Sequence, residues 1–76
     1  MAPEARTITR TPRLIGKGSH LVEPLIREAR LTLGVIRLAA SSEVTAGVII
    51  DQHPRPGRHV ASGTPVDLTV ASGEFG

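Results

Sequence analysis

Cysteine is absent from this 76-residue chain, and aromatic side chains are almost absent. Without thiols, neither a disulfide nor a thiolate metal site can stabilise the fold. The only aromatic residue is Phe75, near the C-terminus. Platforms for single-stranded nucleic acid and most sugar-binding faces depend on aromatic stacking. A polymer-binding surface on this chain must therefore use backbone groups, arginines and aliphatic side chains.

Long apolar runs and blocks of like charge are also absent. No run approaches the roughly 20 residues that span a bilayer, and residues 1–6 lack the apolar segment of a signal peptide. Nine basic and seven acidic residues give a formal net charge of +2, without the charge run of a nucleic-acid-binding tail. We therefore expect no nucleic-acid partner and no membrane insertion by this chain.

Apolar periodicity predicts one small α+β domain. Val66, Leu68 and Val70 alternate with Asp67 and Thr69, which is the period of a strand with one buried face. One helical face upstream has three- and four-residue spacing and consists of Leu21, Val22, Leu25, Ile26 and Ala29. The expected order is β-α-β-β-β: one helix packed on a small, mostly antiparallel three-stranded sheet, with a short extra N-terminal strand, so that both apolar faces are buried.

Local signals refine this expectation. Ser19 precedes the helical pattern and can cap it. Pro24 lies inside the pattern, so we expect a kinked or late-starting helix. From Leu31 the apolar residues alternate and then change parity across Gly34, where we expect a bulge or bend in the strand.

A family resemblance appears in the second half of the chain. The residues that carry it are Gly47, Val48, Ile49, Gln52, Pro54, Gly57, Val60, Gly63, Val66, Leu68, Val70, Ser72 and Gly73. In this order and spacing they resemble the C-terminal half of a PASTA domain, the module named for penicillin-binding proteins and serine/threonine kinases. Residues 11–16 resemble the family's opening strand and turn, and residues 31–36 resemble the exit from its helix.

The resemblance implies a PASTA-like domain over residues 9–73, with residues 1–8 as an N-terminal arm or linker and residues 74–76 as a C-terminal tail. Two residues depart from the family pattern. Pro24 falls inside the family's helix, and Arg30 stands where the family usually has a helix-ending glycine. Arg30 must therefore take a left-handed conformation, or the helix must end differently.

No segment of the chain matches a known catalytic or cofactor-binding motif in both residue type and spacing. The segment Gly16-Lys17-Gly18-Ser19 lacks both the upstream glycine and the adjacent hydroxyl of a phosphate-binding loop. The three histidines fit no zinc-ligand pattern, and no serine lies in a nucleophile elbow. We therefore predict no enzymatic activity, no metal site and no cofactor.

The densest basic cluster lies on a turn that contains two prolines. Its candidate ligand-binding residues are Gln52, His53, Arg55, Arg58 and His59. One interpretation is a rigid turn that presents guanidinium groups to carboxylates or phosphates. The other is a solvated connection between strands. For Gln52, a motif position of the family, the resemblance implies a side-chain bond that pins the turn.

Function rests on the resemblance, which implies a non-catalytic binding module of the bacterial cell envelope. Such a module recognises peptidoglycan fragments, or β-lactams in some penicillin-binding proteins, or acts as an extracellular sensor or anchor. The alternative is a structural module with a protein partner, for instance a phage virion protein used in capsid decoration or fibres. A third possibility is a spacer between other domains. The expected location is extracellular for an excised domain and the virion for a complete protein.

Overall fold

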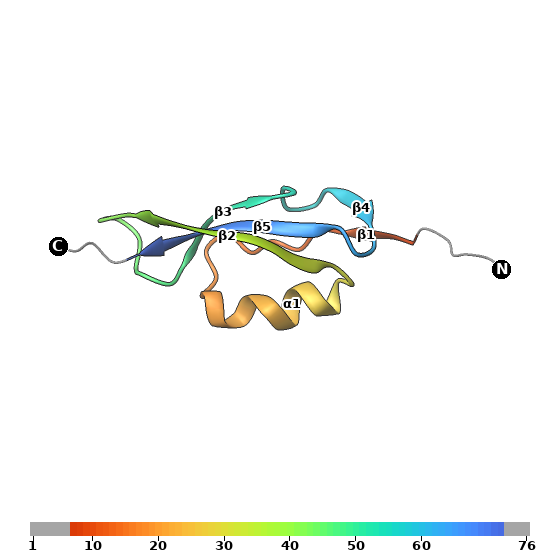
Figure 1. Cartoon of the computed structure of the whole chain (residues 1–76), viewed down its shortest axis with the longest axis horizontal. Helices are drawn as coiled ribbons and strands as arrows, with labels where there is room; N and C mark the ends of the chain where they lie inside the picture. Colours follow the sequence, from red (N-terminus) through yellow and green to blue (C-terminus); the bar gives the residue numbers. More distant parts are fainter. Residues whose placement is uncertain (1–6, 73–76) are drawn as a thin grey trace.

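The structure is a computed structural model that describes residues 7–72. These residues form an α+β fold. The elements are β1 (Ile8–Arg10), the 3₁₀ turn η1 (Ser19–Leu21), α1 (Val22–Glu28), β2 (Thr32–Ala40), β3 (Ile49–His53), β4 (His59–Ala61) and β5 (Pro65–Ser72). Figure 1 shows α1 on one side of the strands, with β1 at one end of the molecule and the end of β5 at the other.

The expected N-terminal arm and C-terminal tail fall mostly on residues 1–6 and 74–76, which lie outside the described residues. Ile8, which we placed in the arm with extension of the first strand as the alternative, is the first residue of β1. Residues 11–14, expected to belong to the opening strand, follow β1 as irregular backbone. The first strand therefore lies earlier in the chain than the resemblance implies.

The strands form a three-stranded mixed sheet in the order β2-β5-β3, and β1 pairs separately with β4. Both β1–β4 and β3–β5 are antiparallel. The β2–β5 ladder is parallel, and the chain between these strands, which includes β3 and β4, provides the long crossover connection that parallel strands need. The α+β class, with one helix and an extra N-terminal strand, is thus confirmed. The short strand β4 was not predicted.

The core lies between α1 and β5. Val66, Leu68 and Val70 are buried while Asp67 is exposed, which confirms the alternation predicted for this strand. Val22 and Ile26 of the helix pack against them in one cluster. The other core members are Leu14, Leu31 and Ile49. Leu21 departs from its predicted place on the buried helical face, being 48% exposed, because it belongs to η1 rather than to α1.

The start of the helix accommodates Pro24 without loss of a hydrogen bond. Because α1 begins at Val22, after η1, Pro24 falls in the first helical turn, where backbone N–H groups have no intrahelical acceptor. The predicted late start is confirmed. The predicted cap is wrong: no side chain caps either helix, and the Ser19 N–H donates to the Gly47 carbonyl at 2.6 Å.

Of the two alternatives for the end of the helix, the structure shows the first: Arg30 adopts a left-handed conformation, with a φ of 63°. Its N–H donates to the Arg27 carbonyl at 2.9 Å, and the Leu31 N–H donates to the Ile26 carbonyl at 3.0 Å. This pair of bonds is a Schellman motif, and the buried side chains of Leu31 and Ile26 complete it. The Arg30 carbonyl in turn accepts the Gly63 N–H at 2.8 Å, which ties the helix end to the turn before β5.

Gly34 marks the predicted bulge in β2. The register with β5 shifts between Leu33 and Ile36. A Cβ at Gly34 would collide with the Asp67 carboxylate, whose Oδ1 accepts the Val35 N–H at 2.8 Å. A side chain at residue 34 would therefore displace the carboxylate that satisfies the bulged backbone.

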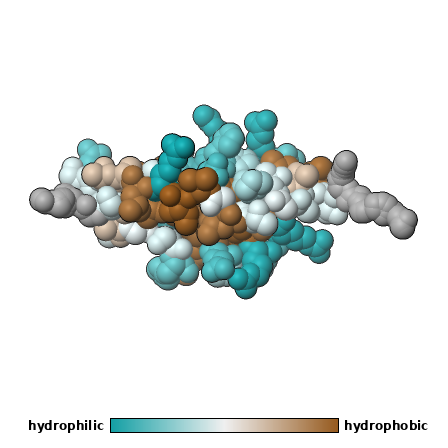
Figure 2. Space-filling model, viewed as in Figure 1, coloured by the Kyte–Doolittle hydropathy of each residue, from teal (hydrophilic) through white to brown (hydrophobic). Residues whose placement is uncertain are grey.

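The helix leaves much of β2 uncovered. The exposed fractions of four large aliphatic residues lie between 45% and 71%; these residues are Leu33, Val35, Ile36 and Leu38. The expectation that the helix buries both apolar faces is therefore wrong for this strand. The reason is length: nine strand residues extend over about 30 Å, whereas seven helical residues reach only about 10 Å. Figure 2 shows the resulting apolar area on the surface.

Replacing Arg30 by glycine is expected to raise the free energy of unfolding by about 0.5–1 kcal/mol, because glycine adopts a positive φ without a Cβ clash. The matched control Arg27→Gly places glycine inside the regular helix and is expected to lower the free energy of unfolding by about 1 kcal/mol. Urea unfolding followed by far-ultraviolet circular dichroism measures both. Equal destabilisation by the two substitutions would contradict strain at Arg30.

Candidate functional site

The basic turn joins β3 to β4. The Arg58 N–H donates to the Arg55 carbonyl at 3.1 Å, which closes a β-turn. Pro56 and Gly57 occupy its central positions, and Gly57 has a φ of 86°. Proline followed by a residue of positive φ is the signature of a type II turn. Pro54, which follows a cis peptide bond, is buried beneath the turn.

Gln52 fastens this turn to the body of the domain. Its side chain is 4% exposed, and its Oε1 accepts the N–H groups of Leu14 at 2.7 Å and Ile15 at 3.3 Å. Its Nε2 donates to the carbonyls of Pro12 at 3.1 Å and Pro54 at 2.9 Å. These bonds use the full hydrogen-bonding capacity of the amide. The structure thus supports the pinning role and leaves the side chain no free group for a ligand.

Thr11 holds the far side of the turn and was missed by the sequence analysis. It is 2% exposed. Its N–H and its Oγ1 donate to the Arg58 carbonyl at 2.8 and 2.7 Å, and its own carbonyl accepts the Gly57 N–H at 2.8 Å. A threonine before a proline carries no distinguishing signal in the sequence, because its partners lie far along the chain.

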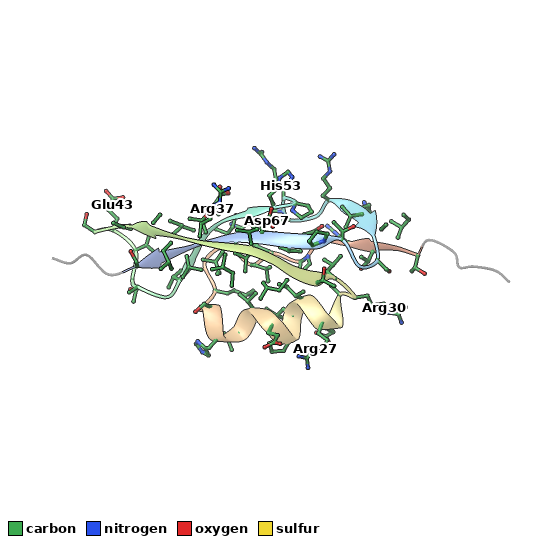
Figure 3. All side chains as sticks on the ribbon, in the orientation of Figure 1. Arg27, Arg30, Arg37, Glu43, His53 and Asp67 are labelled. Atoms are coloured by element: carbon green, nitrogen blue, oxygen red, sulfur yellow. The ribbon has the colours of Figure 1, made fainter. Side chains whose placement is uncertain are left out.

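Arg55 and Arg58 are exposed, as a ligand-binding role requires. Within residues 7–72, the ion pair that forms is Arg27 with Glu23, at 3.0 Å on the surface of α1. Neither turn arginine is paired with a carboxylate in this range. Figure 3 shows Arg27 on the helix and His53 on the opposite side of the sheet.

The two histidines flank the turn but belong to different surfaces. His59 lies opposite Arg10 in the β1–β4 ladder, and His53 lies opposite Asp67 in the β3–β5 ladder. His53 lines a shallow cavity of about 190 Å³ on the sheet face away from the helix; the other charged residues there are Arg37, Asp51 and Asp67. The structure therefore brings His59 next to the basic end of β1 and places His53 on a surface of mixed charge.

Two further arginines border the turn. An open cavity of about 360 Å³ is lined by Arg10, Thr11, Pro12, Arg13, Pro56 and Gly57. A Cβ built on Gly57 would lie 3.9 Å from Nη2 of Arg10, so this guanidinium lies close to the turn backbone. Sequence reasoning did not connect Arg10 and Arg13 with the turn, because more than 40 residues separate them and only tertiary pairing joins them.

Neither a metal centre nor a membrane span emerges from the part of the chain that the structure describes. No three His, Cys, Asp or Glu side chains there gather into a group that could hold a metal ion. No helix there is long and apolar enough to cross a bilayer.

The fold and the turn together define a small α+β module with an exposed basic surface. The family model of the PASTA domain matches residues 9–72, so this chain belongs to the PASTA domain family, as its motif residues predict. A PASTA domain is itself non-catalytic. No curated protein matches the chain.

Two solved structures from Staphylococcus aureus are similar. The three-PASTA-domain structure of a Ser/Thr kinase has a TM-score of 0.77 and 31% identity, covering 86% of this chain and 32% of that one. The entire extracellular region of the Ser/Thr kinase PrkC has the same TM-score and identity, covering 86% of this chain and 23% of that one. The chain thus spans about a third or less of the length of these relatives.

Replacing Gln52 by leucine is expected to lower the free energy of unfolding by about 3 kcal/mol, because its two buried bonds are lost and each leaves a backbone group, the Leu14 N–H or the Pro54 carbonyl, without a partner at a cost of about 1–3 kcal/mol. The matched control His53→Leu alters the adjacent exposed side chain and is expected to change stability by no more than about 0.5 kcal/mol. Urea unfolding measures both variants. Similar midpoints for the two would show that the amide bonds do not hold the turn.

Proposed function

We propose that this PASTA domain is an extracellular, cell-envelope binding module that recognises peptidoglycan fragments through the turn at residues 54–58. Membership of the family supports this proposal, since PASTA domains are linked to peptidoglycan fragments. The similarity to the extracellular region of PrkC supports the location. The observation that carries the proposal is the exposure of Arg55 and Arg58 on a fixed turn.

The chemistry of the turn suits a carboxylate ligand. The stem peptides of peptidoglycan carry carboxylates, and a guanidinium presents paired N–H donors that match such groups. Because Gln52 and Thr11 fix the backbone on either side of the turn, binding orders only the arginine side chains. A smaller ordering cost leaves more of the contact energy as affinity.

The composition also sets the character of the binding. The single aromatic residue, Phe75, lies outside the described residues, so stacking against sugar rings contributes little. Affinity then depends on exposed charges, which salt screens over about 8–10 Å at physiological ionic strength. Binding is accordingly weak and decreases as salt is added.

A separate observation favours a second role, in which β2 pairs with β2 of a second copy of this chain. Within the described sheet, β2 is an edge strand with one side paired to β5. Its exposed aliphatic side chains border an apolar cavity of about 280 Å³ that Val22, Leu68 and Val70 help to line. Edge strands with unpaired backbone groups and apolar side chains readily accept another strand.

The second copy is the occupant because the edge is self-complementary. Two antiparallel copies of β2 related by a two-fold axis place the same apolar residues on both sides of the interface. A register centred on Ile36 puts Arg37 opposite Val35, whereas one centred on Arg37 puts like charges together. The four exposed aliphatic residues of β2 are far fewer than the roughly 20–30 residues per partner of stable interfaces. The dimer is therefore weak and forms only at high concentration.

Neither of the two named relatives is a virion protein, so nothing in these comparisons supports the virion alternative.

Removing both turn arginines, as Arg55→Ala with Arg58→Ala, is expected to weaken binding of soluble peptidoglycan fragments at least about tenfold, which corresponds to about 1.4 kcal/mol. A residue-resolved NMR titration measures the affinity and locates the shifts, which should centre on residues 53–59 in the unaltered chain. The control Lys17→Ala with Arg27→Ala removes the same charge elsewhere and should bind normally. Unchanged affinity in the turn variant would exclude this turn as the site.

Replacing Leu38 by lysine is expected to abolish self-association, because it places a charge among the exposed apolar side chains of the paired edge. Leu21→Lys, a control on η1 outside β2, should leave self-association intact. Sedimentation equilibrium from micromolar to millimolar protein measures both. A chain that stays monomeric over this whole range would rule out pairing through β2.

A further inference from the structure

The cavity beside the turn extends the basic surface. We propose that Arg10 and Arg13 form a second anion-binding subsite, and that the ligand carries two or more carboxylate or phosphate groups that contact both sides of the turn. This inference rests on the proposed function and adds to it a pair of binding residues and a ligand class. It starts from the cavity that Arg10 and Arg13 line together with Pro56 and Gly57.

Both sides of this surface belong to one rigid frame. The β1–β4 ladder places Arg10 opposite His59, and Thr11 bonds to the backbone of Gly57 and Arg58. The carbonyl of Pro12 accepts a hydrogen bond from Gln52 at 3.1 Å. The segment that carries Arg10 and Arg13 is therefore fixed to the turn that carries Arg55 and Arg58. Such a frame holds the backbone positions of the four arginines constant.

Gly57 leaves the turn open on the side of Arg10. The nearest atoms to a Cβ built there would be Nη2 and Nε of Arg10, at 3.9 and 4.0 Å. At these distances, which are those of ordinary van der Waals contact, the guanidinium lies beside the turn backbone. An anion in this cavity can then meet the fork of Arg10 while Arg55 and Arg58 remain accessible from outside.

The charges around the cavity favour a ligand with more than one negative group. No Asp or Glu residue lines it among those the structure describes, and the acidic residues Asp51 and Asp67 line the separate cavity beside Arg37. Four neighbouring cations repel one another, and one anionic group relieves only part of this repulsion. A ligand with two groups places one negative charge against each pair, and arginine suits bidentate contact with either carboxylate or phosphate.

The size of the cavity suits one anionic group. A volume of about 360 Å³ lies at the low end of small-molecule sites, which start near 300 Å³. It has room for one acidic side chain or one phosphodiester unit, and because it is open to solvent the rest of a larger ligand can extend beyond it. Carboxylates of peptidoglycan stem peptides and phosphates of anionic cell-wall polymers share this chemistry, so the experiment separates the two sources.

The test compares three soluble probes by NMR titration: a peptidoglycan fragment with at least two free carboxylates, the same fragment amidated to leave one, and a short glycerol-phosphate oligomer. The unaltered chain should bind the first at least about tenfold tighter than the second. In the double variant Arg10→Ala with Arg13→Ala, the affinities for the two peptidoglycan fragments should become equal. The chemical-shift changes at residues 55–58 should persist. The double variant Arg10→Lys with Arg13→Lys keeps the positive charges but loses the paired N–H donors of the guanidinium groups. It should retain part of the difference in affinity between the two fragments. This control shows whether a loss in the alanine variant comes from the missing charges or from misfolding.

The outcomes separate the two proposals. If the alanine variant keeps the full preference for the fragment with two carboxylates, the subsite is wrong and the proposed function stands. If the unaltered chain binds the phosphate oligomer and neither fragment, with the binding lost in the alanine variant, the subsite stands and peptidoglycan recognition fails. If no probe produces saturable shifts near Arg10, Arg13 and the turn, both proposals are wrong.

Discussion

The buried amide of Gln52 is the contact on which the rest of the structure depends. It joins the end of β3 and Pro54 at the base of the turn to the backbone of residues 12–15, which lies 37–40 residues earlier in the chain. A buried amide with unmet hydrogen bonds is costly, so these segments can pack only where all of its partners are present. The position of the basic turn relative to the core is a consequence of that requirement.

A fixed backbone with exposed arginines follows from this anchoring. Thr11 bonds the opposite end of the turn, and type II geometry at Pro56 and Gly57 limits the motion between the two anchors. The guanidinium groups of Arg55 and Arg58 project from this frame into solvent. The conformational entropy lost on binding a ligand is thus confined to side chains. This arrangement favours recognition of anions by a surface that, within the described residues, contains no aromatic platform.

Features determined by local backbone chemistry could be predicted from the sequence. The bulge at Gly34 follows from a change of apolar parity, and the buried face of β5 follows from strict alternation. The positive φ of Arg30 is one of the two alternatives that the family resemblance implies. Features determined by tertiary pairing could not. Arg10 and Arg13 meet the turn only because β1 pairs with β4, and β2 is exposed because α1 is shorter than the strand it covers.

The order of strands separates the two proposed surfaces. The apolar edge belongs to β2 and the basic turn leaves the end of β3, with β5 between these strands. A second copy paired along β2 in the proposed way therefore extends the sheet away from the turn and leaves the proposed anion-binding residues uncovered. Sites without shared partners contribute independently to stability and binding, so self-association brings two basic surfaces into one particle without altering either. A ligand with repeated anionic groups then gains from simultaneous contact with both surfaces, which raises its effective local concentration.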